Sequence, residues 1–263
     1  MKITSMLLCL ALAAALSFAP SASAFEYAGA NFRIGAKAIA WLPDISGDTR
    51  YDLRLIPIQH GTKLDLVEDL DVDSEMVFGG EGYVGWQDHT ATLRYTFFEY
   101  TSQPVLDRDS VFYGRTFPVG AKVYHTFEWE QVDLEYLYRW LKFDLSLADT
   151  SLDLQLRAKH IEGTGRMMYQ GKVSKPSFSR WVASVGGGFQ MGMLGDHLRF
   201  AAHGTWMEYP ENRTFEMDTK VSGNLWLFGA EIGYRWMLLD VEAGETYIDV
   251  ELAGPYAALT LEF

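Results

Sequence analysis

The chain has 263 residues, of which 48% are hydrophobic and 14% aromatic, and its formal net charge is −13. This aromatic content excludes a disordered or low-complexity chain, and an acidic charge without a basic stripe excludes nucleic acid as a partner. A helical membrane protein is excluded as well, because the only long apolar run lies at the N-terminus.

The N-terminal segment has the features of a secretory signal peptide. A positive charge precedes an apolar run at 6–19, and Ala-Ser-Ala at 22–24 fits a cleavage site that requires small residues. We therefore expect residues 1–24 to be removed and the mature chain to begin at Phe25. The alternative, a transmembrane anchor, is disfavoured because the run is short. The one cysteine, Cys9, lies in this segment, so we expect no disulfide in the mature chain.

The remainder of the chain, residues 25–263, carries apolar and polar residues at alternating positions, which indicates β-strands. In one segment, Leu134 and Tyr136 fall on one face, and Glu135 falls on the other. Several segments keep the alternation for ten residues or more, the length with which a tilted strand crosses a bilayer. We predict strands at residues 29–42, 62–86, 89–101, 117–141, 151–163, 178–194, 198–210, 215–227, 228–241 and 246–263.

These ten segments predict an all-β fold, a single antiparallel up-and-down barrel at 25–263. An even number of strands places both ends of the chain on one side of a membrane. Eight or twelve strands also fit the pattern, because 62–86 and 117–141 are each long enough to contain a turn. Short turns, typical of the periplasmic side of a membrane barrel, are expected at 87–89 and 194–197. Long loops are expected at 43–61, 101–116, 163–178 and 210–218.

Alternation alone does not distinguish a membrane barrel from a soluble barrel, whose apolar face points inward. The tryptophans favour the membrane barrel. They lie near predicted strand ends on the apolar face, where the aromatic side chains of a membrane barrel meet the bilayer interfaces. These tryptophans are Trp41, Trp86, Trp140, Trp181, Trp206 and Trp236.

The last segment, 254–263, ends on Phe263 and places Ala257, Leu259 and Leu261 at the alternate positions before it. This segment resembles the C-terminal strand of Gram-negative outer-membrane β-barrel proteins. The mature chain as a whole is similar in pattern to the small OmpA- and OmpW-like barrels. The resemblance implies export to the outer membrane, contact with its lipid and lipopolysaccharide, and assembly by the machinery that reads this strand. No motif assigns the chain to a characterised functional subgroup.

In a membrane barrel the polar face of each strand points into the lumen. Side chains fill the interior of a barrel with eight to ten strands, and unpaired charges there are costly, so we expect a lumen closed by ion pairs. The alternative is a narrow channel for small polar or anionic solutes, because basic residues are in slight excess. The predicted lumen network is Arg33, Lys37, Glu81, Arg94, Asp133, Glu135, Arg139, Asp153, Arg157, Lys159, Arg199, Glu231 and Arg235, and His203 faces the lumen as well.

The sequence contains no recognisable catalytic motif, and we predict no catalytic residue. His89 and His197 each follow an aspartate in a predicted turn, where Asp is favoured for its local hydrogen bonds. An enzyme at the barrel rim, acting on lipid or peptide, is the third hypothesis. It requires a Ser or Asp within hydrogen-bond reach of His60, His125 or His160.

The acidic stretch at 65–75 does not fit a calcium-binding loop. An EF-hand that began at Asp71 would require Gly at the position of Met76. We therefore predict neither a metal site nor a cofactor and interpret the stretch as a solvated loop, with a loose Ca²⁺ or Mg²⁺ site as the alternative. The expected function is non-enzymatic, that of a barrel with a structural or surface-interaction role. The sequence indicates neither an oligomeric state nor an extracellular partner.

Overall fold

The computed structural model describes residues 32–53, 60–145, 148–194, 197–209, 212–243 and 246–263. The predicted signal peptide, residues 1–24, lies outside this part of the chain. The strands in it are numbered β1 to β15. No helix in the described ranges is long and apolar enough to cross a membrane.

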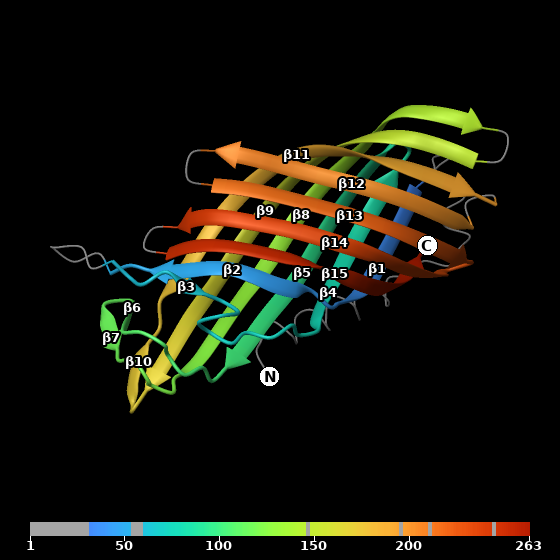
Figure 1. Ribbon diagram of the computed structural model, residues 1–263. Helices are drawn as coiled ribbons and strands as arrows, with labels where there is room; N and C mark the ends of the chain where they lie inside the picture. The colour runs from blue at the N-terminus through green and yellow to red at the C-terminus, as the bar shows by residue number, and fades with distance from the viewer. Residues whose placement is uncertain (1–31, 54–59, 146–147, 195–196, 210–211, 244–245) are drawn as a thin grey trace.

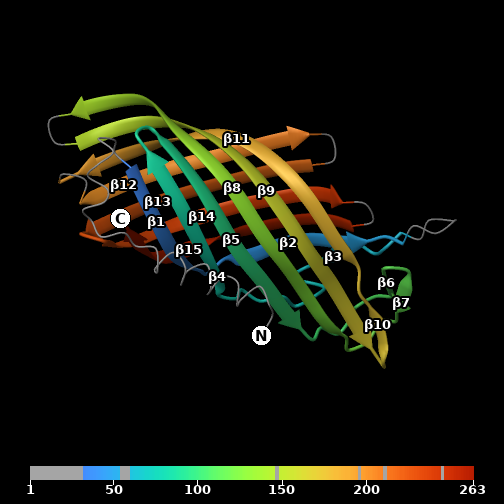
Figure 2. The ribbon, with the colours of Figure 1, turned by 180° about the vertical axis from the view of Figure 1, so that it is seen from behind.

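Ten strands form a closed antiparallel ring, which confirms the predicted fold and the predicted count (Figures 1 and 2). Each ring strand pairs with the ring strand that follows it in the sequence, and the ring closes where the first pairs with the last. In order around the ring the strands are β1 (Phe32–Trp41), β4 (Val77–Trp86), β5 (His89–Ser102), β8 (Tyr124–Leu145), β9 (Ala148–Tyr169), β11 (Ser177–Met193), β12 (Leu198–Tyr209), β13 (Asn212–Leu225), β14 (Phe228–Ala243) and β15 (Thr246–Glu262).

Alternation along each strand separates an apolar exterior from the lumen. On β8, Leu134, Tyr136 and Trp140 are exposed on the outside, whereas Asp133 is buried on the inside. Toward the long loops the outward positions of several strands become acidic, at Glu99, Glu130, Glu162, Glu208 and Glu251. The exterior is therefore an apolar band, as in a barrel that spans a membrane, and acidic residues border this band on the long-loop side.

The two ends of the barrel differ. The C-terminus and the short hairpins at 86–89 and 225–228 lie at one end. At the other end β2 (Asp44–Tyr51) continues from β1 and carries β3 (Leu64–Asp65) on its far edge. The hairpin of β6 (Ser110–Phe112) and β7 (Arg115–Phe117) lies there too, with β10 (Lys172–Ser174) paired to β9 (Figure 1).

The predicted loop at 43–61 contains a strand, β2. The last ring strand, β15, is long enough to pair with β1 along one half and with β2 along the other. The two partners are separated at Leu42-Pro43, and proline has no N–H to donate to a ladder. The chain therefore continues along the same edge after a short break, which the alternation did not reveal.

Four further assignments of loops and strands differ from the structure. Residues 62–86 are not one strand but contain a turn, the alternative that their length had left open, because the chain turns after β3 and resumes pairing only at Val77. The predicted loops at 163–178 and 210–218 are largely strand, since β9 continues to Tyr169 and β13 begins at Asn212. The predicted loop at 101–116 includes β6 and part of β7. The strand segments that were missed lie beyond the apolar band. Their outward residues are not apolar there, so the alternation that predicts a strand is absent.

The lumen is not polar along its whole length. In the half nearer the long loops, the inward positions carry large apolar side chains, among them Phe98, Phe127 and Trp129. Trp41 belongs to this interior layer rather than to the outer aromatic belt, contrary to the prediction. It is 2% exposed, and its indole N–H donates to the carbonyl oxygen of Gly254 at 3.1 Å.

Candidate functional site

A network of buried ion pairs crosses the lumen, and Glu216 on β13 lies at its centre. The carboxylate of Glu216 contacts three cations, Lys159 at 2.8 Å, Arg157, and Arg94 at 3.6 Å. These partners project from β9 and β5, across the lumen from β13. One inward carboxylate thus connects opposite walls of the barrel.

The same cations also pair with carboxylates on neighbouring strands. Arg94 binds Glu81 at 2.9 Å, and Arg157 binds Glu135. Each of these pairs lies directly opposite in the strand register. Such cross-strand pairs follow from alternation alone, because opposite residues of adjacent strands share a face.

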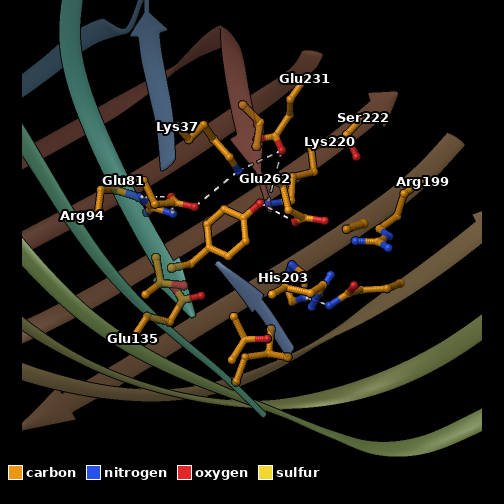
Figure 3. Close-up of a pocket in the computed structure, with 18 of the residues that line it drawn as sticks. Lys37, Glu81, Arg94, Glu135, Arg199, His203, Lys220, Ser222, Glu231 and Glu262 are labelled. Carbon is orange, nitrogen blue, oxygen red and sulfur yellow. Dashed lines mark hydrogen bonds and ion pairs between the residues drawn. The ribbon is translucent and has the colours of Figure 1, made fainter. Parts of the chain in front are cut away.

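A second part of the network joins β1, β4 and β14. The ammonium group of Lys37 lies 3.3 Å from Glu81 and 3.1 Å from Glu231 (Figure 3). The hydroxyl of Tyr256 lies 2.9 Å from Glu231 and 2.9 Å from Asp218 and shares its one hydrogen between the two carboxylates. The network thereby continues around the ring to β13, where Asp218 resides.

Charges in this network are balanced. Its basic groups are Lys37, Arg94, Arg157, Lys159, Lys220 and Arg235, and its carboxylates are Glu81, Asp133, Glu135, Glu216, Asp218 and Glu231. Buried charges are tolerated when each is paired and hydrogen-bonded. The network is therefore a neutral polar layer that fills the lumen.

An aromatic layer lies directly against the polar one. The guanidinium of Arg235 lies 5.4 Å from the ring centre of Trp41 and 5.0 Å from that of Tyr256. Phe98 packs between tryptophans, with its ring centre 6.0 Å from that of Trp41 and 4.3 Å from that of Trp129. The lumen is thus closed twice in succession, by ion pairs and then by packed rings.

The connections at the long-loop end cover the aromatic layer. Leu64, Leu66 and Leu70 are buried there, and the ring of Tyr51 packs on that of Phe112 at 4.6 Å between centres. We call residues 60–76 and 103–123, with the ends of β2 and β9, the cap. Its buried side chains make this end of the barrel a continuation of the core.

On the other side of the polar layer, toward the short turns, the lumen opens into a cavity of about 140 Å³, which we call the vestibule. Its outer lining comes from strand ends near the C-terminus, including Arg33, Asn224 and Glu262. Gly35 allows Tyr83 to lie across its strand and donate to Glu262 at 2.5 Å, because a Cβ there would overlap the ring. The vestibule therefore ends at the ion-pair network (Figure 3).

A histidine–carboxylate pair occupies one wall of the vestibule. Asp153 accepts hydrogen bonds from Ser151 at 3.0 Å and Gln190 at 2.6 Å, and it lies 3.1 Å from Nε2 of His203. Gly188 stands between the two strands, and a Cβ on it would lie 2.1 Å from the imidazole ring. The missing side chain lets His203 reach Asp153.

The structure places every residue of the predicted network at an inward position. Lys37, Glu81, Arg94, Asp133, Glu135, Arg157, Lys159, Glu231 and Arg235 meet in the ion-pair layer, Asp153 pairs with His203, and Arg33, Arg139 and Arg199 line the vestibule. The assembly-signal residues Ala257, Leu259, Leu261 and Phe263 fall on the outward face of β15 and just beyond it.

The sequence analysis missed Glu216, Asp218 and Lys220, although they alternate on β13 with the outward Met217 and Thr219. All three lie in the strand predicted at 215–227, but the first residues of that strand were also assigned to the loop predicted at 210–218. With these residues included, the basic excess expected for the whole lumen is confined to the vestibule.

Each histidine named by the enzyme hypothesis has a polar neighbour. Nδ1 of His60 lies 3.6 Å from Asp52, His125 lies 3.5 Å from the hydroxyl of Ser102, and His160 lies 3.1 Å from that of Ser179. His125, on β8, is buried beneath the cap against Phe112, and His160 faces outward against Trp181. Within the described ranges no carboxylate is hydrogen-bonded to His125 or His160 to orient the ring.

Carboxylates of the acidic stretch have structural roles. Asp65 accepts hydrogen bonds from the backbone N–H groups of Val67 and Glu68, and Asp69 pairs with Arg108 at 2.6 Å. Among the residues that the structure describes, no three His, Cys, Asp or Glu side chains are gathered to hold a metal ion.

No protein-family profile matches the sequence, and no curated protein does. Among solved structures, the outer-membrane protease OmpT of Escherichia coli is 10% identical, with a TM-score of 0.40 over 87% of this chain and 97% of its own. The Neisserial surface protein NspA is 12% identical, with a TM-score of 0.34 over 88% and 97%. Ail of Yersinia pestis is 10% identical, with a TM-score of 0.36 over 88% and 98%.

These neighbours are Gram-negative outer-membrane β-barrel proteins. The fold of this chain is an outer-membrane-type β-barrel. The closed ring of strands and the apolar exterior define this fold.

Proposed function

We propose that the protein is a non-conducting outer-membrane barrel with a structural or surface-interaction role. The observation that carries the proposal is the double closure of the lumen. A solute that entered from the short-turn end would meet the buried contact of Lys159 with Glu216, and behind it the packed rings of Phe98 and Trp129. These contacts between buried side chains support a closed lumen.

The cap supports the surface-interaction part of the proposal. It is built on strands and a buried apolar core, so it presents a fixed shape rather than a solvated chain. Val67, Val105 and Val119 are exposed on it. A rigid surface of this kind supports the proposed surface-interaction role.

The proposed setting is the outer membrane, reached after cleavage at residue 24 and assembled by the machinery that reads the final strand. The apolar band faces lipid, and the acidic border lies where divalent cations link carboxylates to lipopolysaccharide phosphates. With the short turns in the periplasm, the cap faces outward from the cell.

The proposal is tested by swelling of proteoliposomes in isotonic solutions of small sugars. The wild-type barrel is expected to give the swelling rate of empty liposomes. Swelling that depends on the amount of protein and decreases with sugar size would establish the alternative, a narrow channel. Correct insertion is checked by the shift in apparent mass between unheated and boiled samples on a denaturing gel.

A hydrolytic role at the outer wall is the second candidate, favoured by the 3.1 Å contact between His160 and Ser179. A serine beside a histidine base is the minimum for nucleophilic hydrolysis, although such a base normally has a third group that orients it. Hydrolysis of a fluorogenic phospholipid by the wild type, abolished in Ser179→Ala, would establish this role. Equal signals from both proteins would reject it.

A further inference from the structure

Strand β8 extends past its neighbour β5 at the short-turn end of the barrel (Figures 1 and 2). Its pairing with β5 ends at Tyr138, and one further backbone hydrogen bond, from Arg139 to Asp88 at 2.9 Å, lies just beyond it. On its other side β8 stays paired with β9 as far as Leu145. Among the described residues, no strand pairs with 141–145 on the side of β5, and we call this stretch the β8 edge.

The β8 edge carries exposed apolar side chains. Trp140, at a β-bulge just before the edge, is exposed, and so are Leu141 and Phe143 within it. In water, an apolar edge with unpaired N–H and C=O groups is a template for a further strand. In lipid those groups have no hydrogen-bond partner, and open sheet edges do not occur there. The edge is therefore costly in either surrounding unless a further strand pairs with it.

A strand that continues the antiparallel ring on this edge runs opposite to β8, as β5 does. Since β8 runs toward the short-turn end, the added segment must run from outside that end toward the barrel. The chain before β1 has this direction, because it reaches the barrel at Phe32, which pairs with Trp86 of the hairpin at 86–89. A second copy in the same membrane presents the wrong direction, since its β8 edge also runs toward the short-turn end.

We propose that the first residues of the mature chain, Phe25 to Tyr27, form a short strand on the β8 edge. Residues 25–31 lie outside the described part of the chain, directly before β1. The inference rests on the proposed function in one respect, since cleavage at residue 24 must leave Phe25 as the first residue. The protein's own N-terminus then covers the edge.

The residues that connect this strand to β1 are long enough. Phe32 is at the level of Tyr138, because the register of β1, β4 and β5 joins the two. The place beside Leu141 is two strand spacings around the ring from there, about 10 Å, and about 10 Å farther out along the strand direction. These components combine to about 14 Å, whereas the chain from Tyr27 to Phe32 spans up to about 17 Å.

The aromatic side chains of the segment match the outward face of the β8 edge. With Tyr27 opposite Leu141, Phe25 falls opposite Phe143. Alternate residues of a strand share a face, so both aromatic rings join the exposed apolar side chains of β8.

The acidic side chain of the segment matches the other face. In the same register Glu26 falls opposite Lys142, and opposite charges in this position form a favourable cross-strand pair. The ammonium group of Lys142 contacts Asp88 and has three N–H donors, so it can bind a second carboxylate.

The test is disulfide cross-linking in the full mature barrel, in nanodiscs. Cys9 is the one cysteine of the sequence and belongs to the signal peptide, so introduced cysteines have no native cysteine to pair with. After mild oxidation, Tyr27→Cys with Leu141→Cys is expected to give an intramolecular disulfide, detected by mass spectrometry of its peptides.

Tyr27→Cys with Leu225→Cys is the matched control. Leu225 is exposed at the same end of the barrel, on β13. Strands β8 and β13 are each three strands from β1, in opposite directions around the ring. A segment that pairs with neither strand would reach both alike, so the control should give several-fold less disulfide.

Amide hydrogen exchange at 141–145 is the second measurement. Tyr27→Pro removes an N–H from the proposed strand and should accelerate this exchange on the order of tenfold, the effect of losing a backbone hydrogen bond. Ala30→Pro lies in the connection to β1, outside the proposed pairing, and should leave the exchange as in the wild type. Each variant must show the wild-type mass shift on heating.

Equal disulfide yields for Leu141→Cys and Leu225→Cys, or unchanged exchange in Tyr27→Pro, would overturn the inference. Disulfide-linked dimers in place of the intramolecular product would overturn it too, because a second copy then occupies the edge. An intact mass that retains residues 1–24 would overturn the proposed cleavage together with the inference. Swelling of the proteoliposomes would overturn the closed lumen and leave the cross-linking result unaffected.

Discussion

Lys159 and Glu216 meet inside the barrel with Nζ and Oε2 2.8 Å apart, although 57 residues separate them in the chain. Their strands, β9 and β13, do not pair with each other. The contact therefore joins two strands of the ring through the lumen. Because both side chains are buried, removing either one would leave an unpaired charge inside the barrel and destabilise the fold.

Glu216→Gln should destabilise the barrel more than any single change on its outer border. It leaves Arg94, Arg157 and Lys159 with one carboxylate fewer, and breaking a buried ion pair costs about 3 to 5 kcal/mol. The measurement is the free energy of unfolding in urea, followed by tryptophan fluorescence in detergent micelles.

Glu208→Gln, on the outward face of β12, is the control and should change the unfolding free energy by well under ~1 kcal/mol. A Lys159→Met and Glu216→Met double variant should recover part of the loss, because it removes both charges. Equal destabilisation by Glu208→Gln and Glu216→Gln would contradict the central role of the network.

Trp129→Ala should destabilise the cap side of the lumen without opening it. The indole is 1% exposed and packs on Phe98 and Phe127, with the ring centres 4.3 and 5.5 Å away. Removing a buried tryptophan typically costs about 3 to 5 kcal/mol. The unfolding free energy should decrease accordingly, but proteoliposomes that contain the variant should not swell, because the ion-pair layer remains. Swelling in this variant would show that the rings alone close the lumen.

His125 should make the cap sensitive to acid. It lies beyond the apolar band, and burial lowers the pKa of its imidazole to about 4. In the unfolded chain its pKa is near 6.5, so the unfolded chain takes up a proton first as the pH falls. The stability contributed by the neutral ring is complete above pH 6.5. This contribution to stability amounts to about 3 kcal/mol and is lost as the pH falls from 6.5 to about 4.

The pH effect is measured from the urea midpoint at pH 7 and pH 4.5. His125→Gln should reduce the difference between the two midpoints, whereas the exposed His60→Gln should leave it as in the wild type. The interpretation fails if both variants keep the full pH dependence.

Phe263→Ala should impair assembly more than loss of another exposed ring. The backbone of Phe263 donates to Ile34 at 2.8 Å and accepts from it at 3.1 Å, so it closes the barrel between the first and last strands. Its side chain faces outward beside Phe228. We expect several-fold less heat-modifiable protein in the outer membrane for Phe263→Ala than for Phe228→Ala, as measured by gel densitometry. Equal yields would contradict the role of the final residue.

Alternation along the sequence was sufficient to predict the ring of strands and which residues of each strand face inward or outward, since adjacent residues of a strand must face opposite ways. It placed Lys37, Asp133 and Arg157 inward because each stands between apolar neighbours. Where strands continue past the apolar band, as β2 does, their outward residues are no longer apolar and the alternation disappears. For that reason β2 and the cap could not be predicted.

Within the site, only the contacts between residues of adjacent strands could be predicted from the sequence. Arg94 and Asp133 lie opposite each other in the register, so alternation places them together. The contact of Glu216 with Arg157 depends on the width and curvature of the closed barrel, which no local pattern encodes. Trp41 illustrates the same limit, because a tryptophan near a strand end can face either lipid or an apolar layer of the lumen.

Planar-bilayer recording on the purified wild-type barrel tests the closed lumen most directly. The double closure by the Glu216 network and the Trp129 layer predicts a silent bilayer, even when gel shifts confirm folded protein in the recorded sample. Reproducible unitary conductance steps from the wild-type protein would contradict the account.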